Sequence, residues 1–208
     1  MFQISNIKEY IKNNKFIYIG VLALYALGFT IGGAYSNFIS ETAFFESFGT
    51  TKDFFGNLML SKDALNLREL IITDATPVVV ISLCGFFLIG LPFILYFIFK
   101  SGFTLGFYIS FLIKAFSLKG FYLGMFYLIM NILFFLPAIL LVSVNSLEFN
   151  LYILACVNKK YAVHNSFWGR IAICVFMLVL CLILAVLGTN LKAILLPDII
   201  KFLFSSIL

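Results

Sequence analysis

Charged residues are scarce in this chain. Of its 208 residues, 11% are charged and 63% are hydrophobic, and the mean hydropathy is +1.12. A soluble domain has about 25% charged residues, so this composition excludes a soluble globular domain. Acids are the scarcest, and none lies between Pro77 and Val144, where Lys100, Lys114 and Lys119 carry all the charge. The chain is therefore an integral membrane protein, best counted in spans of about 20 apolar residues.

The sequence also lacks the signatures of catalysis and metal binding. Its four cysteines form no CxxC pair, and we interpret them as small apolar core residues. The lone His164 lies beside Tyr161 and Trp168, a group typical of an interfacial anchor. No GxSxG, HExxH or phosphate-loop motif and no paired carboxylate is present. We expect no catalytic residue, no metal and no cofactor, and hence no enzyme.

Long apolar runs predict about five transmembrane helices in an all-α polytopic bundle. These helices cover residues 16–35, 77–99, 102–116, 120–144 and 170–187. The whole chain, 1–208, forms a single membrane domain. Polar segments at 36–76 and 145–169 connect the helices, and we expect the apolar tail 191–208 to lie at the interface or to re-enter the bilayer. Because the first run is as long as a full span, we expect no cleavable signal peptide.

Basic residues near the helix ends predict the orientation. Lysines and arginines divide evenly between the two sides, but the first helix usually dominates, and Lys8, Lys12 and Lys15 all precede it. We therefore place the N-terminus and segment 145–169 in the cytoplasm, and loop 36–76 outside. The net charge of +5 comes mostly from residues that flank helices, so it indicates no nucleic-acid partner.

The long loop 36–76 is amphipathic and predicted to be helical in part. Ser61 is a candidate N-cap for a helix. The loop combines acids with the phenylalanines Phe44, Phe45, Phe48, Phe54 and Phe55. These side chains either rest in the lipid headgroups or form a docking surface for a partner outside the membrane, and the two interpretations are compatible.

Small residues recur at every fourth position in three of the predicted helices. The sets are Gly28, Gly32 and Ser36, then Gly102, Gly106 and Ser110, then Gly120 and Gly124. Such spacing lets helix backbones approach closely. We expect these residues to pack helices within one chain, and a homodimer seam is the alternative.

Two prolines and two predicted turns punctuate the apolar stretch. Pro92, after Gly90-Leu91, is expected to kink the second helix. Lys100-Ser101 and Ser117-Leu118-Lys119 are expected to form tight turns at the membrane surface. Asn131, followed by Pro137, is expected to form a hydrogen bond with a neighbouring helix, with an ion site as the less favoured interpretation.

Several of these motifs together resemble one known family. They are Gly90-Leu91-Pro92, Lys100-Ser101-Gly102-Phe103-Thr104-Leu105-Gly106-Phe107, Leu118-Lys119-Gly120, Asn131 and Pro137-Ala138. In this pattern, in its size and in its long first outer loop, the chain resembles the stage II sporulation protein M family. The resemblance is strongest over residues 81–144.

The resemblance implies a role in endospore formation. Members of that family are expected in the mother-cell membrane at the asymmetric septum. There they hold two peptidoglycan-degrading proteins, stage II sporulation proteins D and P, for engulfment of the forespore. The implied function is a membrane scaffold that recruits and positions these proteins. The alternative is a small transporter or permease subunit with a site at the break 90–92, since broken helices mark transport sites.

Overall fold

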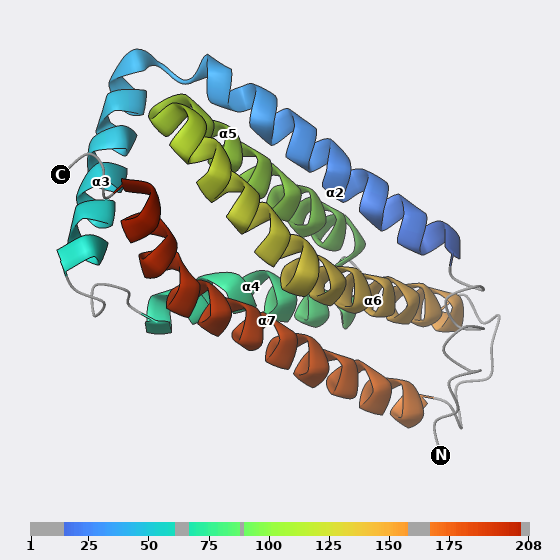
Figure 1. Ribbon diagram of the computed structural model, residues 1–208. Helices are drawn as coiled ribbons and strands as arrows, with labels where there is room; N and C mark the ends of the chain where they lie inside the picture. The colour runs from blue at the N-terminus through green and yellow to red at the C-terminus, as the bar shows by residue number, and fades with distance from the viewer. Residues whose placement is uncertain (1–14, 61–66, 88–89, 158–166, 205–208) are drawn as a thin grey trace.

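The computed structural model describes residues 15–60, 67–87, 90–157 and 167–204. Within these ranges the chain is helical and contains no strand (Figure 1). The elements are α2 (Lys15–Tyr35) with the short 3₁₀ turn η1 (Ser36–Phe38), α3 (Glu41–Leu60), α4 (Leu67–Gly85), α5 (Gly90–Met130), the π-helix η3 (Asn131–Phe135), α6 (Leu136–Val157) and α7 (Phe167–Phe204). The proposed N-cap Ser61 and the lone His164 lie outside the described residues.

Three helical stretches in the described part of the chain are long and apolar enough to cross a membrane. They are Lys15–Phe38, Gly90–Leu154 and Gly169–Leu203. The middle stretch folds back on itself at Ser117, where the backbone has a positive φ of 51°. This confirms the predicted turn at 117–119, and it divides α5 into a first arm (90–116) and a second arm (118–130). The expected all-α membrane bundle is confirmed.

The turn in α5 needs a glycine directly after it. A Cβ added at Gly120 would overlap the carbonyl oxygen of Leu112 on the first arm. Gly124, one turn further along, would place its Cβ 3.1 Å from the side chain of Ile109. The two arms therefore lie against each other as a tight hairpin because glycines occupy their contact line.

Contacts between the helices fix their relative directions. Tyr25 and Phe29 of α2 contact Gly102 and Gly106 of the first arm in the same order, so these two helices run parallel. The helix of η3 and α6 runs antiparallel to α7, because Gly188 meets Phe134 of η3 and the earlier Cys181 packs among residues of α6. The chain thus passes repeatedly along one axis.

The amphipathic helix α3 lies across one end of this bundle, the end at which α5 turns (Figure 1). Its inner side chains reach residues close to the turn: Phe44 packs on Phe111, and Phe48 packs on Phe116. We call this the Ser117 end, and the opposite end, where α4 stops at Gly85, the Gly85 end. The membrane orientation deduced from basic residues stays a prediction.

The predicted boundaries of the second and third helices are wrong. α4 ends at Gly85, and the predicted helix 77–99 is broken there by a turn in which the N–H of Gly90 donates to the carbonyl of Phe87 (2.8 Å). Pro77 lies inside α4 and does not begin it. Pro92 lies in the first turn of α5, where a missing N–H costs nothing, so it does not kink a helix.

The predicted turn at Lys100-Ser101 is also wrong. Both residues lie in the interior of the first arm, which is helical from Gly90 to the turn at Ser117. A charge inside an apolar run usually marks the membrane surface. In the structure Lys100 instead borders a polar cavity midway along the first arm, as described below.

The predicted polar segment 145–169 is wrong over its described part, and so is the predicted end of the last helix at residues 188–190. The interfacial or re-entrant location of the tail 191–208 stays a prediction. α6 continues to Val157, and Asn145, Ser146 and Asn150 are buried in it. The amide of Asn150 donates to the carbonyl of Phe87, which satisfies the backbone just beyond α4. α7 likewise continues through residues 188–190 and through Pro197 to Phe204.

Candidate functional site

The small-residue stripe of the first arm packs against α2. A Cβ at Gly28 or Gly32 would overlap the carbonyl oxygen of Phe99 or Phe103. In the reverse direction, a Cβ at Gly102 or Gly106 would overlap the carbonyl oxygens of Tyr25 and Phe29. The backbones touch from both sides, which only glycine permits. This contact, the glycine seam, is internal to the chain.

The glycine seam ends in a polar contact. The hydroxyl oxygens of Ser36 and Ser110 lie 2.6 Å apart, and the Ser36 hydroxyl is also 2.9 Å from the carbonyl of Gly33. Ser110 therefore pairs within the chain, as Gly102 and Gly106 do. Since α2 fills this groove, the groove is not free for the helix of a partner.

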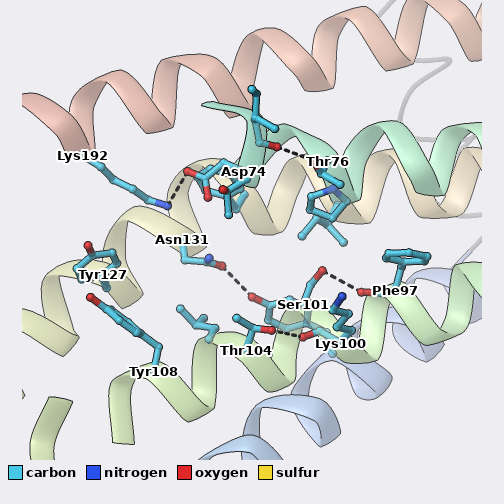
Figure 2. A pocket seen from close by; sticks show the side chains of 17 residues that line it. Asp74, Thr76, Phe97, Lys100, Ser101, Thr104, Tyr108, Tyr127, Asn131 and Lys192 are labelled. Atoms are coloured by element: carbon cyan, nitrogen blue, oxygen red, sulfur yellow. Dashed lines mark hydrogen bonds and ion pairs between the residues drawn. The ribbon is translucent and has the colours of Figure 1, made fainter. Parts of the chain in front are cut away.

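The opposite side of the first arm borders a cavity of about 480 Å³. Its walls come from α4, the first arm, the second arm, η3, α6 and α7, with Tyr25 reaching in from α2. Figure 2 shows that polar side chains of several helices converge on this space. Small-molecule sites typically have volumes of about 300–1,000 Å³, so this cavity is the candidate site.

An ion pair closes one side of the cavity. Lys192 of α7 contacts the carboxylate of Asp74 of α4 at 3.3 Å, and Lys192 is only 7% exposed. The Thr189 hydroxyl lies 2.9 Å from the same carboxylate oxygen. The ammonium of Lys192 is also 3.8 Å from the centre of the Phe135 ring. The charge of Lys192 is thus balanced by a carboxylate of α4, and the ammonium also faces an aromatic ring of η3.

Asn131 lies at the first residue of η3, on the floor of the cavity. Its Oδ1 accepts a hydrogen bond from the hydroxyl of Tyr25 (2.8 Å), which fulfils the expected bond to a neighbouring helix. Pro137 follows at the second residue of α6. Because proline cannot donate a backbone hydrogen bond, the wider π-turn just before it accommodates the missing bond. π-turns are frequent at functional sites.

Lys100 enters the cavity from the first arm. Its neighbour Phe99 contacts Gly28, near the middle of α2, so Lys100 lies midway along the bundle, and its side chain is exposed at the rim of the cavity. The Lys100 ammonium is 5.8 Å from the centre of the Phe97 ring. Among the described residues no carboxylate pairs with it. A lysine within a membrane-spanning helix is costly, by about 2.5–3.5 kcal/mol at the helix centre on insertion scales, and such positions are typical of functional sites.

The phenylalanines of α3 divide into an inner and an outer set. Phe44 and Phe48 are half-buried on the bundle, and Phe55 is 3% exposed within a core cluster. Phe45 and Phe54 remain 67% and 39% exposed. The prediction that all five form one membrane or partner surface is therefore wrong for the inner three.

The remaining predicted residues lie at the Gly85 end. A Cβ at Gly90 would overlap the carbonyl oxygen of Cys84, so Gly90 permits the tight passage from α4 into α5. Pro92 follows in the first helical turn. The cavity is not located at this break, so the structure does not bring residues 90–92 together with the polar residues of the candidate site.

Sequence reasoning missed the charged residues of the cavity because it assigned each one to a connection. Asp74 was placed in the outer loop, Lys100 in a turn and Lys192 in the tail. One signal was available: no acid follows Asp74 until Glu148, so Asp74 sits at the start of a long acid-free stretch and is a candidate partner for a lysine within it. Within the described ranges, no cluster of His, Cys, Asp and Glu could hold a metal ion.

Comparison with protein-family models identifies a family that covers most of the chain. A family model described as Stage II sporulation protein M matches residues 17–188, which covers the glycine seam, the cavity except Lys192, and the turn at Ser117. No curated protein and no solved structure gives a significant match.

Proposed function

The chain belongs to the Stage II sporulation protein M family, which gives it a role in sporulation, and on that premise we propose that it is a membrane scaffold for engulfment. It recruits stage II sporulation proteins D and P and positions these peptidoglycan-degrading proteins at the asymmetric septum, in the mother-cell membrane. The scaffold itself carries out no reaction. Its work is to fix where the degrading proteins act on the wall beside the bilayer.

The observation that carries this proposal is the outer face of α3. This helix rests on the Ser117 end through its inner phenylalanines, and it exposes Phe45 and Phe54 together with Glu41, Glu46 and Asp53. In the predicted orientation this face looks toward the wall. Exposed aromatic residues beside charged ones are typical of surfaces that bind partners. A rigidly supported helix of this kind favours docking, since little conformational entropy is lost on binding.

The docking surface is tested by replacing Phe45 and Phe54 together, once by leucine and once by serine. Leucine retains the affinity for lipid but loses the aromatic shape, whereas serine loses both. If a partner binds this face, the double leucine variant and the double serine variant both reduce recovery of proteins D and P when the chain is purified in detergent from sporulating cells. If the double leucine variant gives the same recovery as the unmodified chain, the side chains of Phe45 and Phe54 only rest on lipid.

Phe176→Ser is the matched control. Phe176 is 62% exposed on α7, away from α3, so this change should leave recovery of both proteins unaltered. Failure of the unmodified chain to retain either protein, with a well-folded preparation, would refute the scaffold itself rather than the docking face.

A small transporter or permease subunit is the second candidate, and the cavity favours it. Polar and charged groups inside a membrane bundle are costly and mark pathways for solutes. Solute uptake by the purified chain in liposomes, at rates above protein-free liposomes, would support transport over scaffolding.

A further inference from the structure

The cavity beside the first arm holds one positive charge that the described residues do not balance. Asp74 and Lys192 neutralise each other at 3.3 Å. Lys100 contacts the edge of the cavity without a carboxylate partner in the described ranges. The lining therefore carries a net positive charge at mid-depth of the bundle, and an anionic group would lower its energy.

The neutral polar groups of the lining have a defined donor and acceptor pattern. The hydroxyls of Thr76, Ser101 and Thr104 each donate to a carbonyl of their own helix, at 2.5, 2.9 and 2.9 Å. Their protons are used, so toward the cavity their oxygens act as acceptors. The hydroxyl of Tyr25 donates a hydrogen bond to Oδ1 of Asn131, and the amide NH₂ of Asn131 remains as a donor. A ligand is thus offered donors by Lys100 and Asn131 and acceptors by the hydroxyls.

The mouth of the cavity opens sideways, between α4 and the first arm. The exposed lining residues belong to these two helices: Ile72, Thr73 and Thr76 on α4, and Lys100 and Thr104 on α5. Acyl chains cannot form hydrogen bonds with these groups. A polar opening on the side of a membrane bundle therefore favours an occupant that arrives from the bilayer or through water and brings its own polar groups.

We propose that this cavity binds an oxyanion that also carries hydroxyl groups. Phosphate oxygens would accept from the ammonium of Lys100 and the amide of Asn131, while the hydroxyls of the ligand would donate to Thr76, Ser101 and Thr104. A glycerol phosphate group has this chemistry, either as the headgroup of phosphatidylglycerol or as soluble glycerol 3-phosphate. The volume of about 480 Å³ suits a group of that size. This binding site does not depend on partner recruitment.

The two sources are distinguished with the full chain in nanodiscs. In phosphatidylcholine discs with a minor fraction of phosphatidylglycerol, native mass spectrometry measures the phosphatidylglycerol that stays bound after release. In pure phosphatidylcholine discs, calorimetry measures the binding of glycerol 3-phosphate. If only phosphatidylglycerol is retained, the ligand is the lipid headgroup. If only glycerol 3-phosphate binds, the ligand is the soluble compound. Each of these results supports the site.

The variant Lys100→Met tests the residue that carries the inference. It should weaken binding by about tenfold or more, as the loss of a charge-assisted hydrogen bond does. Lys100→Arg should retain binding. Lys100→Met should also fold at least as well as the parent, because it removes a charge from a membrane-spanning helix, and its thermal midpoint checks this.

Lys15→Met is the matched control. It removes the same charge from the exposed start of α2, remote from the cavity, so it reports any general attraction of lysines to anionic lipid. Binding lost equally in both methionine variants would assign the effect to surface charge and overturn the site. If the unmodified chain binds neither phosphatidylglycerol nor glycerol 3-phosphate, the proposed site is also overturned.

Discussion

The two faces of the first arm of α5 serve opposite purposes at the same depth in the bundle. On one face, Gly102 and Gly106 touch the backbone of α2, and no space or charge remains between the helices. On the other, Lys100 and Thr104 border an open, polar cavity. The glycine seam fixes the arm in place through close packing, and this rigidity lets the other face hold groups that are costly in a membrane.

Removal of Asp74 is expected to have the largest effect on stability. Asp74→Ala leaves Lys192 buried without its counter-charge, which is expected to lower stability by about 3–5 kcal/mol. Thermal unfolding in detergent measures the loss. The cavity face would then be as important for stability as the seam, through electrostatics instead of packing.

The double variant Asp74→Ala with Lys192→Met is the internal check. Because it removes both charges, it should recover most of the stability. Glu46→Ala, at an exposed position on α3, should leave the unfolding temperature unchanged. If the single and double variants are equally unstable, the ion pair is not the cause, and the loss comes from the shape of the cavity wall.

Filling the glycine seam is expected to have the next largest effect. Gly28→Val places methyl groups where the carbonyl oxygen of Phe99 lies. Backbone cannot yield as a flexible side chain can, so we expect a loss of about 2–3 kcal/mol or separation of α2 from the bundle.

Gly20→Val is the matched change on the same helix. A Cβ at Gly20 meets nothing within 4 Å, so this variant carries the same valine without the overlap. Its unfolding temperature should stay near that of the parent. Equal losses in the two valine variants would attribute the effect to helix propensity, and the seam would then have no special role.

The sequence predicted the seam better than the cavity, for a physical reason. Backbone approach depends on a local pattern, small residues at every fourth position, and Gly28, Gly32, Gly102 and Gly106 can be seen in the chain without knowledge of the fold. The partner of Asp74 is Lys192, far along the sequence, and their meeting depends on how α4 and α7 cross. No local pattern encodes that distance.

Polar residues within apolar runs were the main source of wrong boundaries. Lys100-Ser101 was predicted to be a turn, and Asn145 to begin a connecting segment, because polar groups usually lie at the membrane surface. Here they lie within continuous helices, since Lys100 borders a cavity and Asn150 binds the carbonyl of Phe87. By contrast, the inner and outer phenylalanines of α3 follow helical periodicity. Phe44, Phe48 and Phe55 share one face, so that distinction was available from sequence.

Tyr25 of α2 contacts both faces of the first arm. Its backbone carbonyl contacts Gly102 in the seam, while its hydroxyl crosses to Asn131 on the cavity floor. Tyr25→Phe removes only the second contact, so the seam should persist. Hydrogen bonds between membrane helices contribute about 0.6 kcal/mol on average, and we expect a loss of about 0.5–1.5 kcal/mol.

Tyr35→Phe is the matched control. Tyr35 is an exposed tyrosine of the same helix, and its ring packs on Phe103. Its replacement should lower the free energy of unfolding less than Tyr25→Phe does. Combining Tyr25→Phe with Asn131→Leu then measures the coupling between the two groups. If the bond matters, the double variant costs less than the sum of the single ones. If the costs are additive, Tyr25 supports the bundle through its ring and its carbonyl alone. In that case the two faces of the first arm are energetically independent, and the cavity could be altered without disturbing the helices that surround it.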